Sequence, residues 1–346
     1  MIISQTPVRI SFLGGGTDYP VHFRRHGGAT LVATIDQHTL VTVHRLTRFV
    51  EHELRVHYSN VEIVSSLDDL RHPSARECLR FAGIERGVEI HYVSDLPART
   101  GLGSSSSATV GLLHALHALK GDKVSRRQLA EEAVHVEQEM IRERVGCQDQ
   151  YACALGGLLA LRFSCDGAVS AEPVDANPDR LLALTDRLML LYTGLQREAH
   201  AVLDEQMART EAGDNEMGLM KMAALVDQGI DVIQGRGDLA EFGRLLHDAW
   251  MLKREFSTRI STPALDGYYE RARANGAIGG KLLGAGGGGF LLLSVEPRNR
   301  ERVRNCLPEL MEVPFRFEAS GSTLLLNRPL EERPDAAASA SRAFVV

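Results

Sequence analysis

The segment PARTGLGSSSSA, residues 97–108, says more about the fold than any other stretch of the chain. Its glycines allow the backbone to approach an anion closely, and its four consecutive serines supply hydroxyl donors. Periodic leucines after it predict a helix over about residues 105–119, whose N-terminal N–H groups would face the same place. The segment therefore predicts a phosphate-binding loop, although it has neither the GK[ST] ending of a Walker A loop nor a GxGxxG pattern. A serine-rich helix cap after a flexible loop is the alternative.

Glycine is also concentrated in two further segments. The chain has 32 glycines, where average composition gives about 24, and clusters occur at 14–16 and 284–289. In VRISFLGGGTDY, residues 8–19, Arg9 lies on an expected strand and Asp18 follows the triple glycine. A strand that ends in three glycines leaves room for a ligand, and an ordinary turn is the alternative. The denser run at 284–289 has a high conformational-entropy cost, which favours a second backbone-lined concavity over a purely structural turn.

Two carboxylates in EQEMIRERVGCQDQY, residues 137–151, form a third candidate element. Glu137 lies near the end of a predicted helix, and Asp149 follows a break at Gly146. Carboxylates separated in this way could serve a divalent cation and a proton acceptor. A solvent-exposed glutamate on a charged helix is the alternative for Glu137.

Composition limits the class of protein. The chain has 346 residues, of which 44% are hydrophobic and 24% charged, as expected for two modest folded domains. The net charge of −6 lacks the positive excess expected of a protein that binds nucleic acid or an anionic membrane. No stretch is apolar enough to cross a bilayer, and the N-terminus lacks the features of a signal peptide. Five cysteines fit neither a paired framework nor a CxxC metal spacing, so we expect a reduced, cytoplasmic protein.

Hydrophobic periodicity predicts an α+β fold in two lobes. A strand-rich half ends near residue 180, and a mostly helical half with a closing β/α piece follows. Predicted helices include 125–143, 261–276 and about 298–310. Predicted strands include 8–13, 31–35, 39–46, 89–93, 157–163, 187–193, 290–295, 313–318 and 322–327.

The four segments together resemble the kinases named for galactokinase, homoserine kinase, mevalonate kinase and phosphomevalonate kinase, the GHMP kinases. RISFLGGGTDY is similar to the galactokinase pattern R-V-N-L-I-G-E-H-T-D-Y, and PARTGLGSSSSA to the family's P-x-x-x-G-L-G-S-S-A loop. GAGGGGF is similar to the third family motif, and GCQDQ to G-x-M-D-Q of galactokinase. The resemblance implies an N-terminal ribosomal-S5-like α/β domain (1–180), a C-terminal ferredoxin-like α+β domain with added helices (181–330) and a flexible tail (331–346).

The resemblance also implies an ATP-dependent kinase that uses Mg²⁺. Asp149 would accept the proton of the substrate hydroxyl, and Arg9 would stabilise charge beside it. Glu137 and a loop serine, Ser104 or Ser105, would hold the metal ion. The residues assigned to the nucleotide are Pro97, Gly101, Leu102, Gly103, Ser104, Ser105, Ser106 and Ser107. Those assigned to the substrate are Gly15, Gly16, Thr17, Asp18, Asp149, Lys281, Gly284, Gly286 and Gly287.

Departures from galactokinase bear on the substrate. Gly15 and Gly16 stand where galactokinase has the Glu and His that grip galactose, which predicts a more open pocket for a longer sugar. RISFLGGGTDYP, GCQDQYACALGG and KLLGAGGGGF resemble the branch of D-glycero-D-manno-heptose 7-phosphate kinases. The implied reaction is phosphorylation of the anomeric hydroxyl of heptose 7-phosphate to the 1,7-bisphosphate, for nucleotide-activated heptose synthesis. A distal phosphate would need a cation; the candidates are Arg24, Arg25, Arg142, Arg144, Arg197 and, as first choice, Lys281.

Other interpretations are a kinase for another sugar of fucose or hexose type, or a sugar- or ATP-sensing protein that has lost catalysis. Intact Asp149, Glu137 and Arg9 argue against the sensor. A nicotinamide-dependent dehydrogenase is disfavoured because no GxGxxG follows a strand. The expected partner is a small-molecule sugar or sugar phosphate, without nucleic acid or membrane, and a homodimer is one option for assembly.

Overall fold

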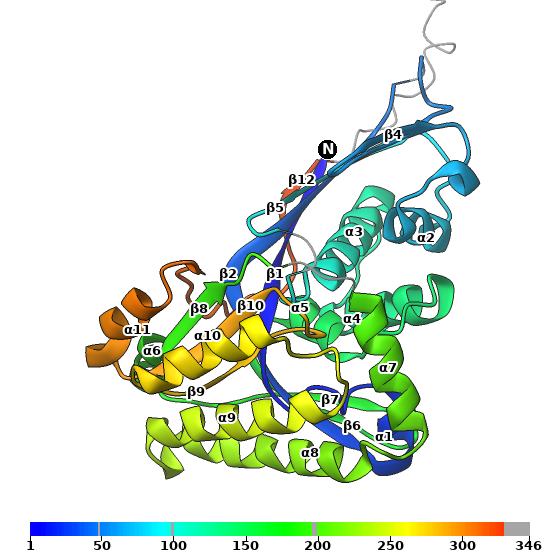
Figure 1. The fold of residues 1–346 in the computed structure, drawn as a ribbon. Helices are drawn as coiled ribbons and strands as arrows, with labels where there is room; N and C mark the ends of the chain where they lie inside the picture. Colours follow the sequence, from blue (N-terminus) through cyan, green and yellow to red (C-terminus); the bar gives the residue numbers. More distant parts are fainter. Residues whose placement is uncertain (48, 98–99, 196–198, 329–346) are drawn as a thin grey trace, which may run out of the picture.

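The computed structural model describes residues 1–47, 49–97, 100–195 and 199–328. Two antiparallel-rich sheets organise this part of the chain, and helices cover both (Figure 1). The first sheet contains eight strands: β1 (Ile2–Leu13), β2 (Gly28–Arg45), β3 (Leu54–His57), β4 (Val61–Val64), β5 (Val88–Ser94), β6 (Leu158–Phe163), β7 (Val169–Pro173) and β12 (Thr323–Asn327). The second contains β8 (Leu188–Tyr192), β9 (Ala277–Leu282), β10 (Phe290–Val295) and β11 (Met311–Glu312).

The long strand β2 determines the shape of the first sheet. The sheet runs in the order β12-β1-β2-β5-β3-β4, and β6 and β7 extend it from the first half of β2. Residues 28–33 of β2 pair with β6, whereas residues 39–45 pair with β5. The sequence predicted two strands here, over 31–35 and 39–46, but β1 pairs with both halves and the strand is continuous. One strand therefore connects the two ends of the sheet.

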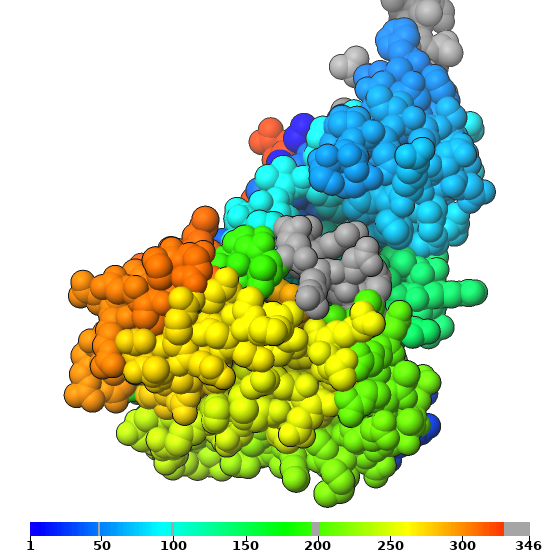
Figure 2. Space-filling view, in the orientation of Figure 1, coloured from blue at the N-terminus to red at the C-terminus, as the bar shows by residue number. Residues whose placement is uncertain are grey.

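One face of the first sheet packs against helices from the N-terminal half. These are α2 (Pro73–Ala82), α3 (Ser104–Lys120), α4 (Arg126–His135) and α5 (Gln148–Leu155). Val41, Val43 and Ile90 from the sheet are fully buried in this core together with Leu112 and Leu116 of α3. A short helix, α1 (Pro20–His26), follows the first glycine cluster. In Figure 2 the segment with β3, β4 and α2, in blue and cyan, forms the upper right end of the molecule, away from the yellow helices.

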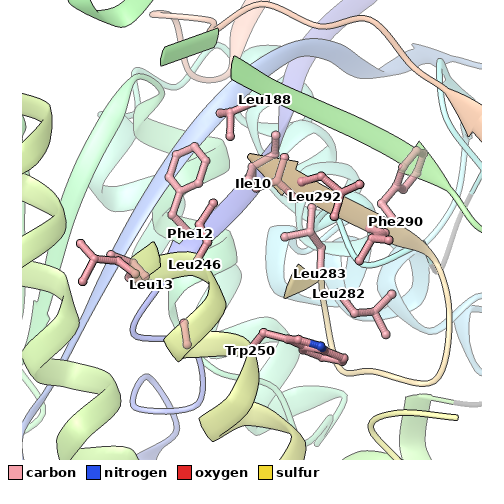
Figure 3. Close-up of a cluster of buried hydrophobic side chains, with 14 of the residues drawn as sticks. Ile10, Phe12, Leu13, Leu188, Leu246, Trp250, Leu282, Leu283, Phe290 and Leu292 are labelled. Atoms are coloured by element: carbon pink, nitrogen blue, oxygen red, sulfur yellow. The ribbon is translucent and has the colours of Figure 1, made fainter. Parts of the chain in front are cut away.

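A second core joins the two sheets and the helices of the C-terminal half. Those helices are α6 (Pro178–Arg187), α7 (Ala199–Glu211), α8 (Glu216–Asp231), α9 (Leu239–Glu255), α10 (Pro263–Ala274) and α11 (Arg300–Cys306). Ile10, Phe12 and Leu13 of β1 lie in one cluster with Leu246 and Trp250 of α9 and with side chains of the second sheet (Figure 3). Because this core contains residues of both sheets, the lobes share a continuous apolar contact.

The structure differs from the sequence-based prediction in three further local places. The helix expected over 125–143 ends at His135 and continues as one π-helical turn, Val136–Met140. The helix expected over 298–310 is shorter, Arg300–Cys306. The strand expected over 313–318 is wrong, because Phe317 makes only an isolated bridge to Ile35. The residues from 329 onward, which include the predicted tail, lie outside the described part of the chain.

The division into two domains at residue 180 remains a prediction. The last strand does not follow that division. β12 pairs with β1 in the first sheet, so residues 323–327 return from the C-terminal half to the N-terminal lobe. Within the described part of the chain, none of the helices combines the length and apolarity that crossing a membrane requires.

Candidate active site

A buried ion pair, Arg9 with Asp149, lies at the centre of the predicted site. Arg9 Nε donates to Asp149 Oδ1 at 2.7 Å and Nη2 to Oδ2 at 2.5 Å, while Nη1 donates to the carbonyl of Gly101 at 2.7 Å. Arg9 is 4% exposed, whereas the Asp149 side chain is 24% exposed. Burial opposes the charge of Arg9, but Asp149 outweighs it and the pKa of Arg9 is raised. This bidentate geometry fixes the orientation of a carboxylate that still reaches solvent.

The predicted phosphate loop lies directly against this pair. A Cβ on Gly103 would lie 3.2 Å from Arg9 Cγ and 3.3 Å from Asp149 Oδ2, so the loop and the pair are in contact. The backbone N–H of Arg9 donates to the carbonyl of Leu102 at 2.9 Å. α3 begins immediately afterwards, at Ser104. The free N–H groups at the N-terminus of α3 and the positive end of its dipole therefore lie beside Asp149, as an anion site requires.

The four loop serines divide into two pairs. Ser107 Oγ donates to the carbonyl of Thr6 at 2.9 Å, and Ser106 Oγ donates to Glu137 Oε2 at 2.9 Å; both serines are buried. Ser105 is exposed and Ser104 is partly exposed. The hydroxyl of Ser107, predicted to bind nucleotide, instead ties α3 to β1. Pro97 is exposed at the start of the loop, and residues 98–99 lie outside the described part.

The surroundings of Glu137 fit a divalent cation. Glu137 is 1% exposed and sits on the π-helical turn, and Gln150 Nε2 donates to its Oε2 at 2.5 Å. Its other oxygen, Oε1, is buried without a hydrogen-bond partner among the described residues, as is Oε1 of Gln150. Burial raises the pKa of Glu137 to about 7, although Thr109, Ser106 and Gln150 oppose the rise. A buried, unpaired carboxylate oxygen beside serine hydroxyls is a donor set that suits Mg²⁺.

The structure changes the choice of serine near the metal candidate. The prediction was Ser104 or Ser105, whereas the hydroxyl that contacts Glu137 belongs to Ser106. Gln150 also contacts Glu137, and the sequence analysis missed this residue. Its signal was its place directly after Asp149, in GCQDQ.

Asp18 lies near the ion pair and is held by backbone N–H groups. Oδ1 accepts from Gly16 at 3.1 Å and Oδ2 from Gln148 at 3.4 Å. Burial, followed by the charge of Asp149, raises the pKa of Asp18 to about 6. A Cβ on Gly146 would lie 1.8 Å from Asp18 Oδ2, so only glycine admits the carboxylate here. Gly146 is thus a positioning residue that the sequence had shown only as a helix break.

The open pocket predicted from Gly15 and Gly16 is half correct. A Cβ on Gly15 would meet only Ser11 Oγ, at 3.5 Å, so this position is open. A Cβ on Gly16 would lie 3.0 Å from Leu219 Cδ2 and 3.2 Å from Gln206 Nε2. Side chains of α7 and α8 fill the space at Gly16, and its φ of +98° favours glycine independently.

Thr17 serves the turn rather than the pocket. Thr17 is fully buried, and its hydroxyl lies 2.8 Å from the carbonyls of both Gly14 and Ala29. It also accepts from the N–H of Ala29 at 3.1 Å. The hydroxyl is therefore fully engaged in joining the glycine turn to β2, and the prediction that it contacts substrate is not supported by its orientation.

The third glycine cluster packs against the phosphate loop. A Cβ on Gly284 would lie 2.3 Å from Gly101 Cα, and one on Gly101 would lie 2.6 Å from the carbonyl oxygen of Leu283. A Cβ on Gly286 would lie 2.9 Å from Ile260 Cα, and the N–H of Gly287 donates to the carbonyl of Ile260 at 2.8 Å. Packing of backbone on backbone thus requires glycine at 101 and 284, where the sequence analysis had expected ligand contact.

Two buried lysines hold these loops. Lys253 Nζ donates to the carbonyl of Leu282 at 2.9 Å and also to that of Gly284. Lys281 Nζ donates to the carbonyl of Phe12 at 2.9 Å. Lys281 was the first choice for a distal phosphate, but it is 2% exposed on β9 and its ammonium group bonds to backbone. Lys253 was missed because nothing in its helical pattern distinguishes it from a surface lysine.

Four of the other five basic candidates lie on the surface. Arg24 and Arg25 are exposed on α1. Arg144 forms an exposed ion pair with Asp204 of α7 at 2.8 Å. Arg142 is exposed and has a φ of +62°, and Arg197 lies outside the described residues.

Comparisons with known proteins identify the family. The profile for the GHMP kinases N terminal domain matches residues 71–157, and the profile for GHMP kinases C terminal matches residues 224–313; together they span about half of the chain. The chain is 28% identical over 313 residues to the D-glycero-alpha-D-manno-heptose 7-phosphate kinase of Campylobacter jejuni, covering 86% of this chain and 91% of that protein.

Two further relatives extend the comparison. The chain is 26% identical to the L-fucokinase/L-fucose-1-P guanylyltransferase of Bacteroides fragilis, covering 89% of this chain but only 36% of that longer protein. A crystal structure of a D-glycero-D-manno-heptose 1-phosphate kinase from Bacteroides thetaiotaomicron shares the fold, with a TM-score of 0.77, 22% identity, and coverage of 94% of this chain and 99% of that one. The two-lobed fold and the family expectation are thereby confirmed: the chain is a kinase and belongs to the GHMP kinase family.

Proposed function

We propose that the protein is an ATP-dependent kinase that phosphorylates the anomeric hydroxyl of a sugar phosphate, with D-glycero-D-manno-heptose 7-phosphate as its preferred acceptor. The observation that carries the proposal is the Arg9–Asp149 pair, in contact with Gly103 at the start of α3. A fixed carboxylate and a helix N-terminus lie side by side. This arrangement suits proton transfer beside a bound phosphate.

In this proposal, Asp149 accepts the proton of the sugar hydroxyl. Arg9 fixes the orientation of Asp149 through two hydrogen bonds, and its guanidinium offsets the negative charge that builds up near the transferred phosphoryl group. Asp18 accepts a hydrogen bond from a sugar hydroxyl, because its carboxylate is held by the N–H groups of Gly16 and Gln148. Positioning of this kind supplies much of the rate acceleration in phosphoryl transfer.

ATP would place its phosphates over the loop of residues 101–107. Ser104 and Ser105 have hydroxyls that are not buried, and the N–H groups at the start of α3 lie next to them. Glu137 and Ser106 are the residues that would hold Mg²⁺. The ion would neutralise phosphate charge when bound.

Support for the acceptor comes from the relatives. The Campylobacter jejuni protein is named a heptose 7-phosphate kinase and aligns over most of both chains. A fucose-type acceptor is the second candidate, because the Bacteroides fragilis relative carries an L-fucokinase name. In either case the partner is a small molecule, and a cytoplasmic location fits a kinase that draws on the ATP pool.

An ATP-consumption assay separates these acceptors. The purified protein is compared on heptose 7-phosphate, mannose, fucose and galactose, each with ATP and Mg²⁺. We expect the highest kcat/KM with heptose 7-phosphate. Turnover with fucose alone would support the second candidate, and turnover with no sugar phosphate would overturn the proposed acceptor.

A further inference from the structure

A histidine-rich cluster lies on the first sheet, outside the kinase site. Glu89 and His91 are two residues apart on β5, so both point to the same face of the sheet. In the parallel register of β3 with β5, His57 stands opposite His91. On the other side, His44 of β2 stands opposite Glu89. Topology therefore places three imidazoles around one carboxylate.

This face of the sheet is open to solvent. The alternate residues Val56, Val88 and Ile90 are fully buried in the core under α2 and α3. The cluster residues occupy the other face, where the side chains of Glu89, His57 and His91 are 16%, 30% and 38% exposed. Figure 1 shows α2 and α3 lying on one side of this end of the sheet only. An ion could reach the cluster without any rearrangement of the core.

The ligand atoms converge on one oxygen of Glu89. Oε1 lies 3.3 Å from His57 Nε2 and 2.8 Å from His91 Nε2, and the three ligand atoms lie within 4.8 Å of one another. Tetrahedral zinc, with ligands at about 2.0–2.1 Å, separates its ligand atoms by about 3.3 Å. The His57–Glu89 distance fits this spacing, and His91 needs to move by about half an ångström to reach it.

Two imidazole nitrogens in the cluster have unused capacity. His57 Nε2 and His44 Nδ1 are buried atoms without a hydrogen-bond partner among the described residues. The rings of His57 and His91 are stacked, with centroids 4.2 Å apart and planes 11° from parallel. Parallel rings with both Nε2 atoms directed to the same carboxylate oxygen are pre-arranged for a shared ligand.

The other oxygen of Glu89 is held from the opposite side. Arg55 Nη1 lies 3.7 Å from Oε2, while Arg55 Nη2 pairs with Glu53 at 2.8 Å. Glu53 therefore balances the charge of Arg55, and Arg55 restrains Oε2. Oε1 faces the two imidazoles, and Arg55 acts as the orienting partner behind a metal ligand.

We propose that His57, Glu89 and His91 form a binding site for a late first-row divalent cation, for which Zn²⁺ is the best fit. Two imidazole nitrogens and one carboxylate oxygen are the ligand types that zinc takes, and partial exposure leaves a fourth position for water. Among the described residues, this is the one group of His, Cys, Asp and Glu side chains whose ligand atoms converge in this way. The ion would link β3 to β5 at a distance from the kinase site along β2.

The test is zinc binding by the full chain. Chelator-treated protein is titrated with Zn²⁺ at neutral pH by calorimetry, in the presence of excess Mg²⁺. We expect one site per chain that the double substitution His57→Ala with His91→Ala weakens by about 100-fold or more, since removal of a ligand exceeds the effect of losing an outer-shell partner. Substitution of Co²⁺ for zinc should give the intense visible absorption of a tetrahedral site.

His52→Ala is the matched control, because His52 lies 61% exposed in the loop before β3. It should leave zinc affinity unchanged. Glu89→Gln is the second variant, since it keeps the side-chain shape and should also weaken binding if the double variant fails to fold. Equal affinity in wild type, Glu89→Gln and the double variant, or an equal loss in His52→Ala, would overturn the proposal.

Discussion

Arg9 and the two buried lysines, Lys253 and Lys281, lie around the same glycine loops but are held in different ways. Arg9 has a carboxylate partner, Asp149, in a bidentate pair. The lysines contact only backbone carbonyl groups, and among the described residues no carboxylate lies within ion-pair distance of either. Burial accordingly lowers the pKa of Lys253 well below its usual value and that of Lys281 to about 7.

The difference separates two uses of a buried cation. A cation paired with a carboxylate fixes the charge and orientation of that carboxylate, which is useful in chemistry. A cation bonded to carbonyl groups fixes the path of a loop, at the expense of an uncompensated charge. We infer that Arg9 serves the reaction directly, whereas Lys253 and Lys281 shape the loops beside it.

Removing the carboxylate should have the largest effect. We expect Asp149→Asn to lower kcat by about 10²–10⁴-fold, because a proton acceptor is lost while Asn still offers Arg9 one oxygen. Nucleotide affinity, measured by fluorescence titration, should stay within about twofold since the loop at Gly103 is unchanged. Near-wild-type kcat would show that the proton acceptor is another group.

The next largest effect is expected from Gly284→Ala, which displaces the carbonyl group to which Lys253 donates. Gly284→Ala places a Cβ against Gly101 Cα at a φ of +72°, so we expect a loss of about 3 kcal/mol in unfolding free energy. Gly15→Ala is the control, because its nearest neighbour would be 3.5 Å away and the change should be below about 0.5 kcal/mol. Urea denaturation measures both, and equal losses would contradict the loop packing.

Removing a lysine should affect the rate more than the stability. In Lys253→Met the carbonyls of Leu282 and Gly284 lose their donor, but a buried charge is also removed, so we expect a stability change below about 1 kcal/mol. The loop would shift beside the phosphate site, lowering kcat by about tenfold. Arg254→Met, the next residue and paired with Asp266 at 3.0 Å, should leave kcat unchanged. A large stability loss without a change in kcat would reverse the interpretation.

The last prediction concerns the pH dependence of stability, which changes gradually with each pH unit. Lys281 titrates near pH 7 in the folded chain and near 10.5 when unfolded, so the unfolded state binds more protons between these values. Stability therefore rises with pH across this window, by at most about 1.4 kcal/mol per unit for one proton. Lys281→Met should flatten the rise of the unfolding free energy with pH, measured by chemical denaturation at a series of pH values. The pKa of Asp18 is about 6, so its titration affects stability at lower pH. That lower part of the series should be unchanged in Lys281→Met and serves as an internal reference.

The resemblance to family motifs predicted much of the candidate site. Arg9, Asp149 and the 101–107 loop are far apart in sequence, yet the structure brings them into contact, because β1, α3 and α5 converge there. Their spacing matched a known pattern, and such a pattern records three-dimensional proximity indirectly. Some local features need no long-range contact: Thr262 directly precedes α10, and its hydroxyl accepts from the N–H of Leu265 as an N-cap.

Other features depend on contacts that no local pattern encodes. Gly146 looks like a helix break until Asp18 is placed beside it, and Gly16 looks like an opening until Leu219 and Gln206 fill the space. Lys253 has the periodicity of any helix residue, and only its burial under Leu282 and Gly284 distinguishes it. These roles arise from long-range packing, so they follow from the assembled fold alone.

The return of β12 to the first sheet has a consequence for synthesis on the ribosome. β12 supplies the edge partner of β1 from Ile2 to Gln5, and Ser322 beside it bonds Thr6 and His114. Until residue 327 has emerged, the outer edge of β1 is left with unpaired N–H and C=O groups. A nascent N-terminal half would therefore expose a short strand edge that can pair with other chains. If the N-terminal lobe folds during synthesis, this edge stays unpaired until β12 emerges.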